Sequence, residues 1–217
     1  MGIFERAIEF AEPAVEQALK DHGLIVGGWG QAMITDAVRD MMRGRRQPDR
    51  WMPDFRVCRK PITGTPHWPA DRRGQFTFLV DAKFRHADQR NYSIQMLPLL
   101  FAKHLSLPVF YVVCTLHDDN TCTDFQVISH DNIAFADYYA ATPCCDSCWQ
   151  AFTGPDPAKD IPDRCPGQKV TSRSSGTPYV LIRPSFVKPL TQDVFDVYAM
   201  AKDVRGRPAF DPKNSLV

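Results

Sequence analysis

The sequence lacks an excess of charge of either sign, a long apolar run and an apolar leader. Its 26 lysines and arginines are balanced by 25 aspartates and glutamates, and the formal net charge is +1 over 217 residues. With no global basic field, any contact with nucleic acid must come from local clusters. No apolar stretch approaches the length that spans a bilayer. Met1 to Lys20 reads as an amphipathic helix with four glutamates rather than a signal peptide. We therefore expect a cytoplasmic protein with no membrane contact.

Two other features are missing. No Gly-Lys-Ser/Thr follows Gly27-Gly28-Trp29-Gly30, so these glycines predict a turn rather than a phosphate-binding loop. The chain has no internal repeat. Apolar residues make up 44% of it, which is enough to build a core. Its length allows one domain with an elaboration or two small domains.

The most informative stretch contains two short acidic motifs. Pro53-Asp54 lies in one expected strand, and Asp81-Ala82-Lys83 closes the next, after the apolar run at residues 76–80. If these strands pair, Asp54 and Asp81 converge on one edge of a sheet. Because side chains alternate along a strand, Asp81 and Lys83 lie on the same side.

Two converging carboxylates repel each other unless a divalent cation lies between them. Oxygen ligands of this kind favour Mg²⁺ or Mn²⁺ over zinc. The pattern therefore predicts a metal site with Asp54 and Asp81 as ligands. Lys83 would orient or help deprotonate a water there, or stabilise a phosphate oxygen.

The order of the expected elements gives these motifs a context. Apolar periodicity predicts a helix followed by three strands, then a second helix and a further buried strand. Their expected ranges are 4–20, 24–26, 51–58, 75–85, 93–105 and 107–116. A shorter strand is expected at 125–128, a short helix or aromatic loop at 133–141, a strand at 178–183 and a helix at 192–202.

With this order, the Pro-Asp and Asp-x-Lys motifs resemble those of the PD-(D/E)xK nuclease superfamily, which includes restriction endonucleases and Holliday-junction resolvases. The resemblance covers roughly Phe4 to Thr115. It implies an α/β fold, a restriction-endonuclease-like αβββαβ core with a mixed central sheet flanked by helices. It also implies Mg²⁺-dependent hydrolysis of DNA phosphodiester bonds, with Asp54, Asp81 and Lys83 as catalytic residues.

The resemblance also implies further site residues. Resolvase-like members complete the metal site with an acidic residue on the first helix, and Glu12 fits this position better than Glu16 or Glu9. A glutamine or tyrosine after the Asp-x-Lys strand is a frequent additional element, which makes Gln95 and Tyr92 secondary candidates. Many relatives act as homodimers, so the resemblance makes a homodimer an expectation here as well.

We expect residues 1–118 to form the nuclease-like core and residues 119–217 to form a cysteine-containing elaboration packed on it. Basic residues surround the expected site, which favours a polyanionic substrate, although a solvated basic loop explains the cluster equally well. The candidates for contact with DNA are Arg45, Arg46, Arg50, Arg56 and Arg85.

Seven cysteines are present, and four of them lie in the short stretch from Cys144 to Cys165. In a reducing compartment this favours metal ligands or buried thiols over a disulfide framework. Cys145 and Cys148 have Cys-x2-Cys spacing, and Cys165 is a candidate third ligand for structural zinc. The candidates for a fourth ligand are Cys144, Cys122, His117 and His130. The sequence has no proline-framed run of four cysteines, so it does not favour an iron–sulfur cluster.

Three other readings remain open. The first is a nuclease-like fold that binds nucleic acid or protein without cutting it. The second is a zinc-stabilised interaction module whose Asp-x-Lys match is accidental. A cysteine nucleophile paired with histidine, such as Cys148 with His130, is the third, but no nucleophile motif surrounds either residue.

Overall fold

The computed structural model describes residues 7–29, 52–59, 76–103, 105, 107–135, 141–169, 176–191 and 193–195. Within this part of the chain, no helix is both long and apolar enough to cross a membrane. Of the basic candidates, Arg45, Arg46 and Arg50 lie outside the described residues.

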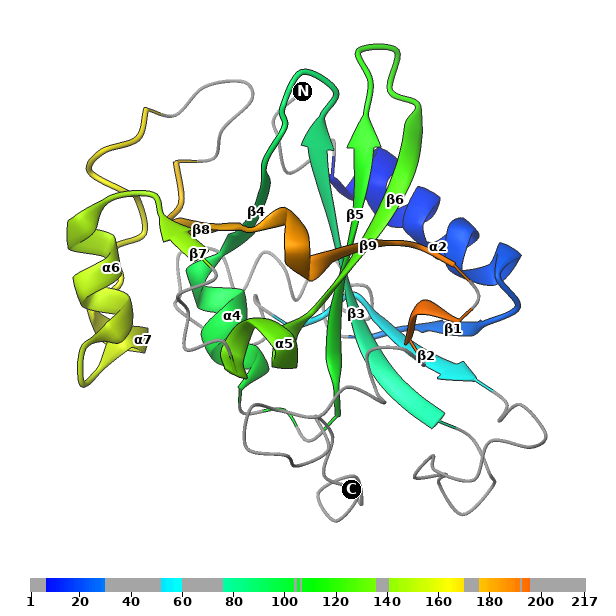
Figure 1. The fold of residues 1–217 in the computed structure, drawn as a ribbon, viewed down its shortest axis with the longest axis horizontal. Helices are drawn as coiled ribbons and strands as arrows, with labels where there is room; N and C mark the ends of the chain where they lie inside the picture. Colours follow the sequence, from blue (N-terminus) through cyan, green and yellow to red (C-terminus); the bar gives the residue numbers. More distant parts are fainter. Residues whose placement is uncertain are drawn as a thin grey trace, which may run out of the picture.

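The described elements are strands and short helices (Figure 1). The first half contains η1 (Ala7–Ala11), α2 (Glu12–Asp21), β1 (Ile25–Gly28), β2 (Phe55–Arg59), β3 (Phe76–His86), β4 (Tyr92–Gln95), α4 (Met96–Ala102) and β5 (Val109–Leu116). The second half contains β6 (Cys122–Ser129), α5 (His130–Phe135), β7 (Ala141–Pro143), α6 (Asp146–Thr153), α7 (Pro157–Asp160), β8 (Tyr179–Ile182), η4 (Pro184–Phe186) and β9 (Val187–Pro189).

The main sheet has six strands in the order β1-β2-β3-β5-β6-β9. Strands β3 and β5 are parallel, with Asp81 opposite Tyr111, and the other neighbours are antiparallel. Parallel strands need a crossover between them, and here the connection contains β4 and α4. The protein is therefore an α/β fold with a mixed sheet, as the sequence predicts.

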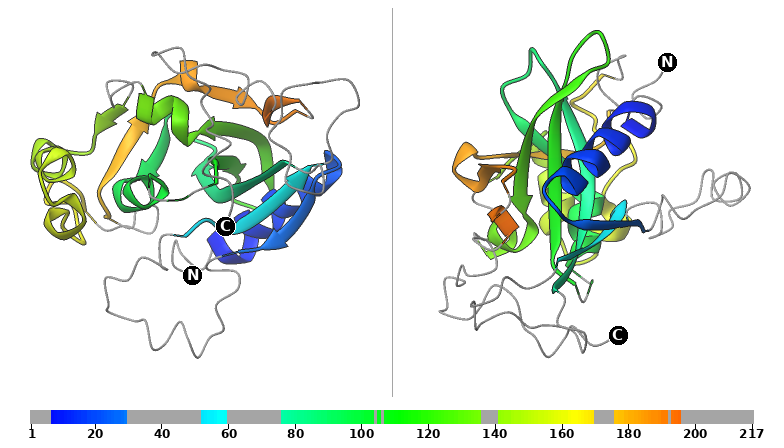
Figure 2. Two further views of the ribbon diagram at one scale, coloured as in Figure 1. Left: turned by 90° about the horizontal axis from the view of Figure 1, so that it is seen from below. Right: turned by 90° about the vertical axis from the view of Figure 1, so that its right-hand side faces the viewer.

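Helix α2 covers one face of this sheet, as the right-hand view of Figure 2 shows. Ala11, Val15 and Leu19 recur every four residues, so they form one buried stripe along the helix. They pack with strand residues that include Phe78 and Phe110, which meet edge to face with their ring centroids 5.2 Å apart. This packing directs the start of α2, where Glu12 lies, towards the sheet.

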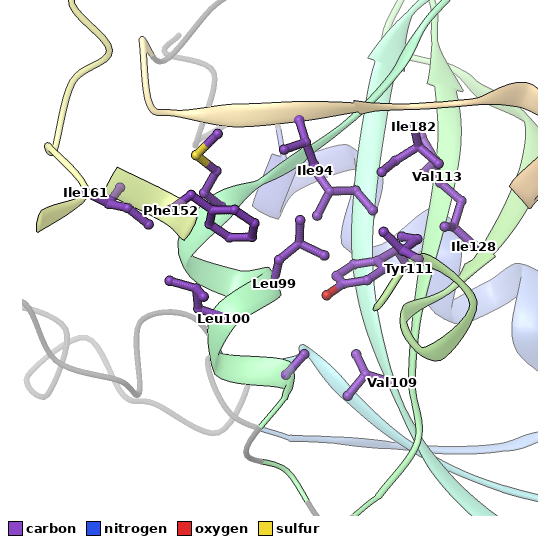
Figure 3. Close-up of a cluster of buried hydrophobic side chains, with 14 of the residues drawn as sticks. Ile94, Leu99, Leu100, Val109, Tyr111, Val113, Ile128, Phe152, Ile161 and Ile182 are labelled. Carbon is purple, nitrogen blue, oxygen red and sulfur yellow. The ribbon is translucent and has the colours of Figure 1, made fainter. Parts of the chain in front are cut away.

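The other face of the sheet is covered by α4, α5 and a second, smaller sheet. Leu99 of α4 lies between Tyr111 and Phe152 in the buried cluster of Figure 3, to which Leu100 also belongs. Because β3 alternates, Leu79 belongs to this cluster, while Phe78 and Val80 belong to the cluster under α2. Asp81 and Lys83 follow Leu79 at intervals of two and project from the same face.

The second sheet has the order β4-β8-β7 and is antiparallel throughout. Helices α6 and α7 follow β7, and their buried Phe152 and Ile161 join the cluster that contains α4. The chain after residue 119 is divided between the two sheets. Strands β6 and β9 extend the main sheet, whereas β7 and β8 build the small one.

The local structure differs from expectation in three places. The segment expected to be a helix from residue 93 begins as β4 and becomes helical only at Met96, because β4 pairs with the distant strand β8. The expected turn at Gly27-Gly28 is strand instead, since both glycines pair with β2. Helix α5 begins at His130 rather than at Ile133.

Candidate metal centres

The strand register brings the two predicted aspartates together. Phe55 pairs with Val80 in the antiparallel β2–β3 ladder. Asp54, one residue before Phe55, therefore lies opposite Asp81, one residue after Val80. Both aspartates are only 4% exposed. The Trp29 amide donates a hydrogen bond to the Asp54 carbonyl at 2.7 Å, which continues the pairing with β1.

Hydrogen bonds orient both carboxylates. The backbone amide of Ala82 donates to Oδ2 of Asp54 at 2.8 Å. The ammonium group of Lys83 donates to Oδ1 of Asp81 and forms an ion pair with it. Each carboxylate therefore has one oxygen directed to a partner within the Asp-x-Lys motif.

The electrostatics of Asp54 show that its negative charge is disfavoured. Burial, then the neighbouring charge of Asp81, raise the pKa of Asp54 well above its usual range. Lys83 and the Ala82 hydrogen bond act in the opposite direction, while Glu12 raises this pKa further. Additional positive charge near Asp54 would therefore stabilise its charged form against burial and against the charges of Asp81 and Glu12.

Lys83 is the cation of this cluster. Burial lowers its pKa, but the charges of Asp81, Asp54 and Glu12 more than offset this effect, and the pKa is raised overall. Lys83 is therefore held in its charged form. About a quarter of its side chain remains exposed, 24% against 6% for Asp81.

Helix α2 supplies the third acidic residue. Glu12 begins α2 and is half-buried, and its charge affects both Asp54 and Lys83. Glu16 lies one turn later and forms a surface ion pair with Lys20 at 2.6 Å. The two glutamates on one helix thus have different partners: the charge of Glu12 acts on Asp54 and Lys83, whereas Glu16 pairs with Lys20.

This donor set suits a hard divalent cation. Carboxylate oxygens are the ligands that Mg²⁺ and Mn²⁺ prefer, and thiolates or imidazoles are the softer alternatives. Burial first, and then the charge of Asp81, raise the pKa of Asp54, and Lys83 does not fully offset these effects. Asp54 and Asp81 are the residues that would hold such a cation, and the charge of Glu12 also acts at this point. We call these three residues and Lys83 the acidic cluster.

The secondary candidates have their described contacts elsewhere. The Gln95 amide donates to Oγ1 of Thr177 at 3.1 Å, next to the small sheet. The guanidinium of Arg85 lies over the ring of Tyr92, 5.0 Å from its centroid, and binds Asp124 at 3.0 Å. These contacts link Gln95, Tyr92 and Arg85 to neighbouring segments of the fold.

Arg56 is placed differently. It is exposed on β2, opposite Leu79 of β3. Asp54 and Arg56 are two residues apart on extended chain, so they project from the same face. A cation on this face, close to the aspartates, is available to a polyanionic ligand.

A buried polar group adjoins the acidic cluster and was not found from the sequence. The Tyr111 hydroxyl and Nδ1 of His130 share a hydrogen bond of 3.2 Å. Burial, and then the charge of Lys103, lower the pKa of His130 to about 4, so its imidazole is neutral at pH 7. Burial raises the pKa of Asp131 to about 6. Only the apolar context of Tyr111 was visible in the sequence, and this gave no sign of its partners.

The second candidate centre consists of cysteines. The Sγ atoms of Cys144, Cys145, Cys148 and Cys165 all lie within 4.8 Å of one another. Cys148 and Cys165 are buried, while Cys144 and Cys145 are half-buried. The structure therefore brings together the Cys-x2-Cys pair and Cys165, and it adds Cys144 as the fourth member.

The other candidates for a fourth ligand are bound elsewhere. His130 contacts Tyr111, and His117 lies 2.8 Å from Oγ1 of Thr123. The thiol of Cys122 donates to the carbonyl of Phe10 beside the main sheet. The described hydrogen bond of His130 is with Tyr111, whereas Cys148 belongs to the cysteine group, so these contacts do not pair the two residues as a nucleophile and its base.

Hydrogen bonds from Ser147 and the Cys148 amide lower the pKa of Cys145 to about 6. Burial raises the pKa of Cys165 to about 11 and that of Cys148 beyond the usual range of a thiol. Cys145, Cys148 and Cys165 thus differ widely in how easily each loses its proton when no cation is bound.

Comparisons of the chain with protein-family models, curated proteins and solved structures found no match. The geometry of the two candidate centres is therefore what indicates the function.

Proposed function

We propose that the protein is a metal-dependent endonuclease that hydrolyses phosphodiester bonds of DNA at the acidic cluster. The observation that carries this proposal is the convergence of Asp54, Asp81 and Lys83 with Glu12, from two strands and a helix. The order α2, β1, β2, β3, α4, β5 also fits the restriction-endonuclease-like αβββαβ core, with β4 as an addition.

Each residue has a role that its position supports. Asp54 and Asp81 would hold Mg²⁺ or Mn²⁺, and Glu12 would act as a third ligand or as a partner of the attacking water. When bound, the cation would neutralise charge on the phosphate and promote deprotonation of water. Lys83, held charged by its carboxylate neighbours, would orient the water or bind a phosphate oxygen.

The ammonium of Lys83 and the guanidinium of Arg56 also supply attraction for a phosphate backbone. Both side chains project from the face of the sheet that carries Asp81. Because the chain has a net charge of only +1, this local attraction matters more than any field of the whole molecule. Binding through it should weaken as salt concentration rises.

A non-catalytic binding module is the second candidate function. The four-cysteine group favours it, because a small zinc-stabilised unit can serve recognition alone. Cleavage separates the two proposals. Plasmid, branched and single-stranded DNA are incubated with the protein and Mg²⁺, Mn²⁺ or EDTA. The nuclease proposal predicts products that require Mg²⁺ or Mn²⁺, whereas the binding proposal predicts complexes without products.

The two glutamates of α2 provide a matched test of the site. We expect Glu12→Gln to reduce cleavage about 10- to 100-fold, the range seen when groups that support metal ligands are removed. Glu16→Gln changes the same helix but removes only a surface ion pair, so cleavage should stay within about twofold of wild type. Rates are measured with the best DNA substrate in Mg²⁺. Equal effects of the two substitutions would remove Glu12 from the site.

A further inference from the structure

We propose that Cys144, Cys145, Cys148 and Cys165 bind one structural zinc ion that fastens helix α6 to the small sheet. This site is separate from the acidic cluster and does not depend on the proposed nuclease activity. The argument rests on the spacing of the sulfur atoms, on the backbone around them and on the elements that they join.

The spacing of the sulfurs fits a single ion. A tetrahedral site with Zn–S bonds of about 2.3 Å places its sulfurs roughly 3.8 Å apart. Here all four Sγ atoms lie within 4.8 Å of one another, and those of Cys145 and Cys165 are 3.4 Å apart. A cubane iron–sulfur cluster binds each cysteine through a different iron, which requires wider spacing. Four thiolates without carboxylate or open position are typical of structural rather than catalytic zinc.

The backbone brings each cysteine to this point. Cys145 is the N-cap residue of α6 and Cys148 lies in its first turn, so both sulfurs lie at the positive end of the helix. The Cys144 amide donates to the carbonyl of Tyr179 at 3.0 Å, and the Tyr179 amide donates to Sγ of Cys144 at 3.4 Å. An amide that donates to a thiolate is the kind of outer partner that supports metal ligands.

The turn after Cys165 is built for close approach. The Gln168 amide donates to the Cys165 carbonyl at 3.1 Å, which closes a tight turn around Gly167. A Cβ atom at Gly167 would lie 3.3 Å from Cβ of Cys145 and 3.9 Å from Sγ of Cys165. Because glycine has no side chain, the turn after Cys165 can lie directly against the segment that carries Cys145.

The ion would join several short segments. Helices α6 and α7 contain eight and four residues, lengths that are marginal without tertiary support. Cys144 follows β7, and its partner Tyr179 begins β8, which pairs with β4. One ion thus connects β7, β8, α6 and the turn at Cys165. It would also hold Phe152 against the cluster that contains α4.

The first test is metal content. The full chain, purified with reducing agent and without added metal, should contain one equivalent of zinc by plasma mass spectrometry. A mercurial thiol reagent should release that zinc under native conditions, and Co²⁺ exchange should give the strong absorption of a tetrahedral thiolate site. These measurements use the wild-type protein, so a variant that fails to fold does not affect them.

Substitutions then assign the ligands. Cys144→Ala, Cys145→Ala, Cys148→Ala and Cys165→Ala should each lose zinc and melt at lower temperature. Cys58→Ala and Cys122→Ala, half-buried cysteines outside the group, should keep one equivalent. Iron in place of zinc, a disulfide with no metal, or full zinc content in the Cys165→Ala variant would each overturn the proposal.

Failure of the zinc proposal can be distinguished from failure of the nuclease proposal. Mg²⁺ does not bind a site of four thiolates well, because sulfur ligands favour softer cations. If a chelator removes Mg²⁺ but leaves the zinc in place, adding Mg²⁺ back should therefore restore cleavage. If the zinc has been removed as well, added Mg²⁺ should not refill the cysteine site. A protein with one zinc and no cleavage would retain this inference and reject the nuclease.

Discussion

The Asp54→Asn variant should lose cleavage and gain stability in the absence of metal. A metal ligand is removed, so we expect activity in Mg²⁺ to fall by at least about 100-fold, the upper end of the loss for outer-shell partners. The amide oxygen can still accept the hydrogen bond from Ala82, while the buried charge and its repulsion by Asp81 and Glu12 disappear. The metal-free free energy of unfolding should therefore rise.

The control is Asp21→Asn, at the opposite end of α2 from Glu12. Asp21 is exposed and accepts a hydrogen bond from Gln17 at 2.7 Å. This variant should cleave at the wild-type rate and show little change in stability. DNA binding by Asp54→Asn should remain or strengthen, because one negative charge near the phosphates has been removed. Wild-type cleavage by Asp54→Asn would exclude Asp54 as a ligand. A loss of metal-free stability would contradict its electrostatic destabilisation.

The Lys83→Met variant should lose both activity and metal-free stability. Removing a single group that stabilises transition-state charge lowers kcat about 10²- to 10³-fold in other enzymes, and we expect a loss of this size. The carboxylates of Asp81, Asp54 and Glu12 also lose the positive charge placed among them. The variant should therefore unfold more easily than wild type when no divalent cation is present.

Added Mg²⁺ should raise the melting temperature of Lys83→Met more than that of wild type, because the cation replaces the missing ammonium. Binding to the native state alone stabilises by about 2.7 kcal/mol at 100 times the dissociation constant. Lys20→Met, which removes the surface partner of Glu16, is the control and should respond to Mg²⁺ as wild type does. Equal Mg²⁺ shifts in wild type and Lys83→Met would show that the cation binds away from Lys83.

The local geometry of the acidic cluster could be anticipated because it depends on short-range rules. Alternation along one strand is enough to place Asp81 and Lys83 on the same side, and their ion pair has this arrangement. The apolar runs marked β3 and β5 as central strands. Glu12 could be ranked above Glu16 only through the resemblance, because both glutamates lie on the exposed side of the same helical pattern.

The parts that were missed depend on pairing between distant segments. Tyr92–Gln95 has no alternating pattern of its own and becomes strand because β8, more than 80 residues later, pairs with it. Cys144 and its partner Tyr179 are also far apart along the chain, by 35 residues, which left the fourth cysteine open among several candidates. Likewise, the contact of Tyr111 with His130 has no signal in either local sequence.

The division of the chain at residue 118 stays a prediction. The main sheet crosses this boundary. Strand β6 pairs with β5 along most of its length, and β9 pairs with β6. A core that ended before β6 would expose the edge of β5, which is buried at every position. The second half of the chain therefore contributes to the layer that positions Asp81, as well as to the cysteine site.

The most direct test of the central claim is the position of Mn²⁺ in a crystal. Diffraction recorded on both sides of the manganese absorption edge locates the ion by its anomalous signal, independently of any assay. The account predicts a peak between the carboxylates of Asp54 and Asp81, on the side reached by Glu12, at roughly 2 Å from their oxygens. Fully occupied Mn²⁺ elsewhere, with no peak between these two residues at saturating concentration, would contradict it.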